Sequence, residues 1–359
     1  GGRERAEKIK KKSIEFKEKE KLLSEDYRLI ENELNELLIK LPNIPAEIVK
    51  SGISKEDNEI IENYADINKY ENLSVPHWEI VSKYDLIDFE LGNKISGSGF
   101  PVYKGYGARL QRALINFFID EAVKAGYKEY EVPILVNSDS AYSTGQLPDK
   151  DGQMYFVGED NMYIIPTAEV PLTNMFRDMI LKEEDLPLRC VSYTPCFRRE
   201  AGSYGKDVRG LNRLHQFDKV EIVQIATQEK SYEVLEEMCY HVSSLLKKLE
   251  LPYRRVRLCG ADMSFTSALT YDFEVYSAGQ KRWLEVSSVS NFETYQSNRM
   301  KLRYKTKDKK TLLAHTLNGS ALALPRIVAA LIENNYSEDG IRLPHVLFEY
   351  IGIEKIKKE

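Results

Sequence analysis

Residues 197–221 read FRREAGSYGKDVRGLNRLHQFDKVE, a pattern of two strands joined by a glycine-rich basic loop. Alternation along a strand places Arg198 and Glu200 on one face of the first strand. The same alternation groups four residues of the returning strand: His215, Phe217, Lys219 and Glu221. The loop carries three glycines and three cations, namely Gly202, Gly205, Gly210, Lys206, Arg209 and Arg213. Such a loop suits a polyphosphate or an RNA backbone, although a glycine-rich loop taken alone is more often a plain polar hairpin.

Three further segments have distinctive sequences: PTAEVPLTN (166–174), WLEVSSVSNFETYQSNRMKLRY (283–304) and HTLNGSALALPRIVAALIEN (315–334). Together with residues 197–221, the four segments resemble the class II aminoacyl-tRNA synthetases and, within that class, the bacterial type of the seryl-tRNA synthetase family. In chain order they resemble its amino-acid-binding loop, motif 2, the metal and ATP strand, and motif 3. The resemblance extends over residues 70–352, which is the whole catalytic core.

The resemblance implies an α+β fold with a mainly antiparallel sheet flanked by helices. It implies activation of L-serine by ATP with Mg²⁺, followed by transfer of the seryl group to the 3′ end of tRNA(Ser). Adenylation of this kind depends on positioning and charge neutralisation rather than on a nucleophilic triad.

The resemblance also assigns roles to individual residues. The implied L-serine site comprises Thr167, Ala168, Glu169, Arg198, Glu221 and Ser320. The implied ATP site comprises Arg198, Arg199, Glu200, Leu214, Phe217, Glu285, Val286, Ser287, Ser288 and Arg326. Glu285 and Ser288 are the implied Mg²⁺ ligands, as hard oxygen donors.

Several of these residues also have an ordinary structural interpretation. Thr167 and Ser320 are suited to cap helices, Glu169 to complete a capping box, and Phe217 to fill the core. Glu285 and Ser288 are unremarkable on sequence alone, and only the resemblance distinguishes them.

Composition sets broad limits on function. The chain has 359 residues, 42% of them hydrophobic, and a formal net charge of −5. Such a length favours a large domain with an appendage, and the negative charge restricts RNA contact to local patches. One such patch is residues 299–310, where seven basic residues accompany only Asp308. A solvated hairpin edge explains that run as well as an RNA contact does.

The cysteines indicate the compartment. Cys190, Cys196, Cys239 and Cys259 show neither a C-x-x-C pair nor zinc spacing, which is typical of reduced thiols in the cytoplasm. No signal peptide opens the chain, and no apolar run approaches the ~18 residues of a membrane helix. We therefore expect a cytoplasmic protein without a membrane segment.

The domain organisation follows from composition. Residues 1–41 are rich in Lys and Glu, with an apolar stripe at Ile9, Phe16, Leu23, Tyr27, Ile30, Leu34, Leu37 and Leu41. This predicts a long helix that needs a partner helix. In the resembled family it corresponds to the returning helix of a tRNA-binding coiled-coil arm, and we expect its partner helix to be absent here. A dimerising coiled coil is the alternative. Residues 42–69 are predicted as a linker and residues 70–359 as the catalytic domain.

Elements of the catalytic domain can be predicted from periodicity. Helices are expected from His77, over 105–126, over 167–180 and over 323–334, and strands over 253–259, 270–276 and 282–289. Residues 127–136 are predicted as a strand resembling motif 1, in which Pro133 lies at a homodimer interface. An ordinary edge-strand proline is the alternative.

Two other functions stay open at this point. One is a serine-activating ligase that charges a carrier protein, although no cysteine or histidine cluster suits its metal. The other is a catalytically silent paralogue, which would be expected to lack Arg198, Glu285 or Arg326. The sequence departs from the family at Val289 and Pro325, where cysteine and a small residue are common, and neither change removes an assigned role.

Overall fold

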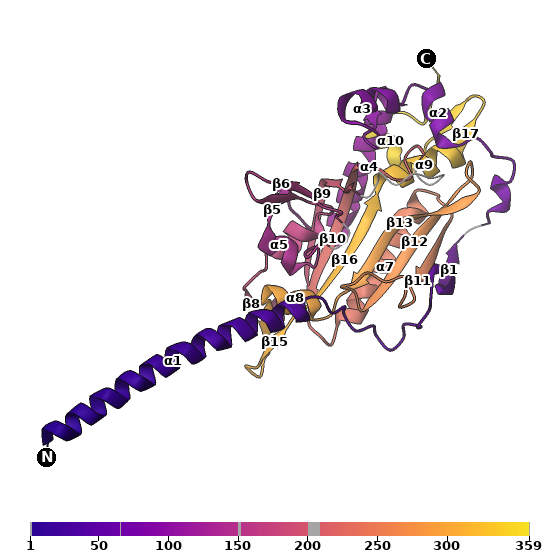
Figure 1. The fold of residues 1–359 in the computed structure, drawn as a ribbon. Helices are drawn as coiled ribbons and strands as arrows, with labels where there is room; N and C mark the ends of the chain where they lie inside the picture. The colour runs from indigo at the N-terminus through magenta and orange to yellow at the C-terminus, as the bar shows by residue number, and fades with distance from the viewer. Residues whose placement is uncertain (1, 65, 150–151, 200–208, 359) are drawn as a thin grey trace. The chain divides into compact units, whose positions relative to one another are not determined.

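The computed structural model describes residues 2–64, 66–149, 152–199 and 209–358 (Figure 1). The chain divides into two units, Gly1–Pro42 and Asn43–Glu359. None of the helices in the described residues is long and apolar enough to cross a membrane.

The first unit is the helix α1 (Gly2–Leu38), which confirms the long helix expected near the N-terminus. It buries none of its residues, and the apolar side chains of the stripe stay exposed, among them Phe16 and Tyr27. An exposed apolar stripe of this kind is what the sequence predicts for a helix that pairs with another.

The second unit is organised around an eight-stranded sheet. Its order is β1-β11-β12-β13-β16-β10-β9-β4, and every neighbouring pair is antiparallel except β4 with β9. The strands are β1 (Glu59–Tyr64), β11 (Tyr253–Arg257), β12 (Leu269–Ser277), β13 (Arg282–Asn291), β16 (His315–Ala323), β10 (Gln216–Ala226), β9 (Leu188–Phe197) and β4 (Lys128–Glu129). The expected mainly antiparallel α+β fold is confirmed.

Three helices share one core with this sheet: α4 (Gly105–Lys124), α7 (Ser231–Lys248) and α9 (Leu324–Asn335). Alternation on the central strands explains the arrangement. Val220 and Ile222 of β10 enter the core with the helices, whereas Lys219 and Glu221 line a cavity. One face of the sheet is therefore structural, and the other is available for chemistry.

Smaller elements complete the unit. The other helices are α2 (His77–Lys83), α3 (Phe89–Ser96), α5 (Ser138–Ser143), α6 (Glu169–Asn174), α8 (Tyr295–Met300) and α10 (Phe348–Ile351). The other strands are β2 (Ile87–Asp88), β3 (Val102–Tyr103), β5 (Leu135–Asn137), β6 (Tyr155–Val157), β7 (Met162–Ile164), β8 (Ile180–Lys182), β14 (Arg303–Lys305), β15 (Thr311–Leu313), β17 (Tyr336–Ser337), β18 (Gly340–Arg342) and β19 (Lys355–Ile356).

The structure corrects two predicted elements. The continuous strand expected over 127–136 is wrong: β4 and β5 are separate, and Pro133 lies between them because proline has no N–H to donate to a ladder. The helix expected over 167–180 is also wrong in length, since α6 ends at Asn174 and the following residues form turns before β8. In addition, the segment 42–69 contributes the edge strand β1, which pairs with β11.

Candidate active site

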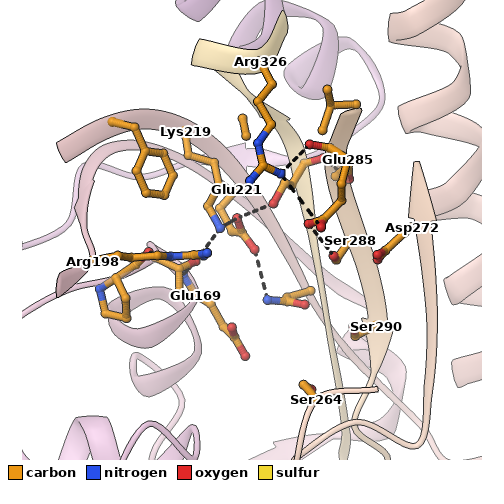
Figure 2. Close-up of a pocket in the computed structure, with 18 of the residues that line it drawn as sticks. Glu169, Arg198, Lys219, Glu221, Ser264, Asp272, Glu285, Ser288, Ser290 and Arg326 are labelled. Carbon is orange, nitrogen blue, oxygen red and sulfur yellow. Dashed lines mark hydrogen bonds and ion pairs between the residues drawn. The ribbon is translucent and has the colours of Figure 1, made fainter. Parts of the chain in front are cut away.

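A cavity of about 650 Å³ lies over the polar face of the central sheet, within residues 43–359 (Figure 2). Its size is that of a pocket for a nucleotide-sized ligand. Strands β10, β12, β13 and β16 supply its floor. The assigned residues that line it are Thr167, Glu169, Arg198, Leu214, Phe217, Glu221, Glu285, Val286, Ser287, Ser288, Ser320 and Arg326. The three residues whose loss would mark a silent paralogue are all present there.

Glu221 is the centre of a buried polar cluster. Its Oε2 lies 2.5 Å from Lys219 Nζ and accepts a hydrogen bond from Ser320 Oγ at 3.3 Å. Its Oε1 accepts from Asn318 Nδ2 at 3.0 Å, and Lys219 also donates to Thr167 Oγ1 at 2.8 Å. β10 and β16 pair Glu221 with Ser320 directly across the ladder, which brings residues 99 apart in sequence into contact. The cluster is a small pocket of fixed donors and acceptors.

Two members of this cluster have no role in the sequence assignments. Lys219 stands on the same strand face as Phe217 and Glu221, and it balances the charge of Glu221. Asn318 stands two residues before Ser320, so alternation along β16 would have placed it on the same face. Neither residue could be assigned to the site from the sequence, because their contacts with Glu221 depend on how the strands pair.

Glu169 lies beside this cluster at the N-terminus of α6, and it is buried. Its Oε1 accepts a hydrogen bond from Gln296 Nε2 at 2.7 Å. Burial raises the pKa of Glu169 to about 7, and the neighbouring Glu221 carboxylate adds to the increase. A carboxyl group with this pKa can hold or release a proton near neutrality. A cation bound beside it would stabilise its ionised form.

Arg198 lies directly after β9 and is held on two sides. Its guanidinium stands 5.3 Å from the centre of the Phe217 ring, and its Nε donates to Pro166 O at 3.5 Å. Both side chains line the cavity, so the planar cation and the aromatic ring present adjacent binding surfaces.

A bulge in β13 brings Glu285 and Ser288 together. Residues three apart on a regular strand face opposite sides, but the pairing with β12 slips between Glu285 and Ser287. As a result Ser288 Oγ lies 3.5 Å from Glu285 Oε1. Among the described residues, no group of three His, Cys, Asp or Glu side chains could hold a metal, so a cation here would need ligand oxygens or water as well.

Two neighbours adjust the charge around this pair (Figure 2). Arg326, in the first turn of α9, donates through Nη1 to Glu285 O at 2.6 Å, and the same nitrogen lies 3.9 Å from Glu285 Oε2. Asp272 pairs with Ser288 across the ladder. Burial, together with the Glu285 charge, raises the pKa of Asp272. The site therefore holds both a fixed cation and a small acidic cluster.

Some assigned residues lie elsewhere. Ala168 is fully buried in a separate apolar cluster, and Arg199 does not line the cavity. His215 packs against the ring of Phe100 at 5.3 Å instead of facing the cavity. Glu200, with Gly202, Gly205 and Lys206 of the loop, lies outside the described residues.

Comparison with known proteins agrees with this geometry. Residues 155–335 match the family described as tRNA synthetase class II core domain (G, H, P, S and T). The chain is 52% identical to the serine–tRNA ligase of Salinibacter ruber, across 100% of this chain and 84% of the relative. The chain belongs to the serine–tRNA ligase family. A second relative, the serine–tRNA ligase of Methylacidiphilum infernorum, is 50% identical across 96% of this chain and 82% of its own.

Solved structures extend the family match to the fold. The seryl-tRNA synthetase from Pyrococcus horikoshii complexed with ATP superposes with a TM-score of 0.90 and 32% identity, covering 94% of this chain and 80% of that chain. The cytoplasmic serine–tRNA ligase from Naegleria fowleri in complex with AMP gives a TM-score of 0.87 and 26% identity, covering 94% of this chain and 81% of that chain. Like other members of the serine–tRNA ligase family, this chain is a class II aminoacyl-tRNA ligase.

Proposed function

We propose that the cavity binds L-serine and ATP, forms seryl-adenylate with release of diphosphate, and passes the seryl group to tRNA(Ser). The observation that carries this proposal is the buried Glu221–Ser320–Lys219 cluster, which lies beside Glu169 and Arg198 in one cavity. Family membership supports the reaction, and the geometry supports the roles of individual residues.

The serine pocket is the buried polar end of the cavity. The Glu169 carboxylate, with Thr167, receives the ammonium group, and Glu221 with Ser320 receives the hydroxyl. A site built to hydrogen-bond a hydroxyl leaves buried groups unpaired when alanine enters, so it discriminates strongly. Lys219 and Asn318 hold Glu221 from two sides, which fixes the position at which the hydroxyl is received.

The ATP site is the end formed by Phe217, Glu285 and Arg326. The Phe217 ring stacks on adenine, with hydrogen bonds to the base from the backbone near Leu214 and from Glu200. Arg198 contacts the α-phosphate together with the serine carboxylate, and Arg326 contacts the γ-phosphate or the adenine face. Planar, always-charged guanidinium groups suit both tasks.

In the reaction, a serine carboxylate oxygen bonds to the α-phosphorus, and the bond from that phosphorus to the diphosphate oxygen breaks. Arg198 holds the two reacting groups together and offsets the negative charge that develops between them. Glu285 and Ser288, as hard oxygen donors, fit Mg²⁺, which when bound would neutralise phosphate charge. In the second step the 3′-terminal ribose hydroxyl takes the seryl group, and AMP leaves.

The proposal extends to partners and location. We infer that α1 contacts tRNA(Ser), that the chain forms a homodimer through the region around Pro133, and that it works in the cytoplasm. All four cysteines lie in the described residues and are free thiols, which suits a reducing compartment.

The test is ATP–pyrophosphate exchange with Mg²⁺, run separately with each of the twenty amino acids. Serine alone should drive exchange above background, because the Glu221–Ser320 pair is placed to receive the hydroxyl of a small side chain. Equal exchange with threonine or alanine would overturn the serine assignment.

A further inference from the structure

A buried histidine, His77, does not line the cavity but contacts a segment that does. His77 begins α2 and is completely buried. Its Nδ1 lies 2.7 Å from Glu333 Oε1, and its Nε2 accepts a hydrogen bond from the Leu211 backbone N–H at 2.9 Å. Residues 211–214 line the cavity, so His77 touches the binding site through the backbone.

The partners of His77 determine its tautomer. A backbone N–H can only donate, so Nε2 must carry a lone pair, and Nδ1 must carry the proton that is donated to Glu333. Glu333, on α9, accepts further hydrogen bonds from two backbone N–H groups, that of His77 at 2.9 Å and that of Gly279 at 3.2 Å. It also accepts one from the hydroxyl of Ser277. Burial raises the pKa of Glu333, but hydrogen bonds from His77 and Ser277 outweigh it and lower the pKa. Glu333 is therefore a fixed anion that orients the imidazole.

The backbone is shaped to reach this imidazole. Gly210 has a φ of +69°, and a Cβ at that position would lie 2.2 Å from His77 Nε2. A side chain at position 210 would therefore separate Leu211 from the histidine. Glycine at position 210 therefore permits the close contact between α2 and the segment 209–214.

The contact continues to Arg326. The Asn212 carbonyl, one residue beyond Leu211, accepts a hydrogen bond from Arg326 Nε at 3.1 Å. The Asn212 side chain donates to Gln280 Oε1 at 2.9 Å, and Gln280 donates to Glu333 Oε1 at 3.3 Å. Both routes begin at Glu333 and end at the backbone that holds the guanidinium of Arg326.

We propose that His77 is a positioning residue for ATP: anchored by Glu333, it fixes Leu211 and Asn212 so that Arg326 is held in place for the nucleotide. This inference rests on the proposed ATP site, and it assigns no direct ligand contact to His77. Glu221 is held by Lys219, Asn318 and Ser320, and none of these three residues belongs to this network, so serine binding should depend on it little.

Two substitutions separate the two bonds of the imidazole. In His77→Asn, the amide keeps a donor near Glu333 but is too short to accept from Leu211. In His77→Gln, the amide oxygen reaches the position of Nε2 and restores the acceptor for Leu211, while the bond to Glu333 is lost. Leu245→Ala, in the buried face of α7, is the control for a loss of stability remote from the site.

The experiment measures three quantities on the full chain with Mg²⁺: ATP affinity by calorimetric titration, the KM for serine in exchange, and deuterium uptake in peptides spanning 209–214. His77→Asn should weaken ATP binding about five- to tenfold, the effect of one lost buried hydrogen bond, and should increase uptake. His77→Gln should recover part of the ATP affinity that His77→Asn loses, because the acceptor for Leu211 returns while the anchor to Glu333 does not. The KM for serine should change little in either variant.

Two results would overturn the proposal. One is an unchanged ATP affinity in His77→Asn. The other is a loss of ATP binding that is matched by the loss of serine binding in both His77 variants and in Leu245→Ala. That result would show that His77 only stabilises the fold. If the original chain binds ATP but shows no serine-dependent exchange, the proposed function fails while the ATP titration still tests this inference.

Discussion

Arg198 is the residue on which adenylation should depend most. It contacts Phe217 and Pro166 and lines the cavity. Arg198→Ala should lower serine-dependent exchange by about 10²–10³-fold, because it removes a charge-assisted contact that strengthens in the transition state.

The measurement is kcat/KM for exchange, with circular dichroism and a melting curve to show that the fold persists. Arg189→Ala is the matched control, since Arg189 lies on β9, pairs with Glu237 and does not line the cavity. A loss of less than about fivefold for Arg198→Ala would remove it from the α-phosphate role.

Glu169 makes the pH dependence of serine binding predictable. Its folded-state pKa is raised from 4.5 to about 7, so the folded protein binds this proton more tightly than the unfolded chain. Its contribution to stability is therefore greatest below pH 4.5 and is lost as the pH rises through about 7. Serine binding should show the opposite trend, because the ammonium group needs the ionised carboxylate.

We therefore expect the KM for serine to fall as the pH rises from below to above the Glu169 pKa, and then to level off. Glu169→Gln should raise the KM and flatten this profile, while the KM for ATP follows the same profile in both proteins. An unchanged pH profile in Glu169→Gln would show that another group receives the ammonium.

At the scale of elements, the bulge in β13 matters most to the site. It places Glu285 and Ser288 on one side of the strand, where a regular strand would separate them. The ladder partner of Glu285 is Glu274, whose side chain instead pairs with Arg254 and does not line the cavity. Adjacent carboxylates of the same sheet thus have different environments.

Glu285→Gln should raise the Mg²⁺ concentration for half-maximal exchange by about 10- to 100-fold, because the cation loses a charged oxygen ligand. Glu274→Gln is the matched control and should leave this concentration unchanged. The measurement is a Mg²⁺ titration of exchange at saturating serine. An equal shift in both variants would point to a general change in charge instead of a ligand.

At the scale of the molecule, the cavity belongs entirely to the unit of residues 43–359. α1 has no buried side chain. Deletion of residues 1–41 should therefore leave serine-dependent exchange within about twofold, since no buried side chain is lost. Charging of tRNA(Ser) should fall much further, because we assign the tRNA contact to α1. The comparison of exchange with charging in the two chains tests this, and equal charging would place the tRNA contact in the catalytic unit.

The proposed homodimer can be tested at the strand after Pro133. Leu135 in β5 is 40% exposed, which leaves an apolar side chain available to a second copy of the chain. Leu135→Asp should convert the dimer to a monomer in analytical ultracentrifugation, because burying an unpaired carboxylate opposes association. Ile95→Asp, at an exposed apolar position of α3, should remain dimeric. A monomer in the original chain would refute the proposed dimer directly.

The sequence by itself determined several local elements and much of the cavity lining. The period of α4 and the alternation of β10 are local properties, so 105–126 and the Phe217–Lys219–Glu221 face could be read without a structure. The long α1 followed from its composition in the same way. Motifs located most cavity residues because they lie within short segments.

Only the tertiary structure showed through which contacts the separated residues meet. Pairing of β10 with β16 brings Glu221 into contact with Asn318 and Ser320. A bulge in β13, which the sequence pattern does not predict, brings Glu285 to Ser288. His77 meets Leu211 and Glu333 across 134 and 256 positions of the chain. Local propensity acts over a few residues, whereas burial and hydrogen bonding act between any groups that the fold brings together. For this reason the charge balance of Glu221 and the anchoring of His77 became visible only in the structure.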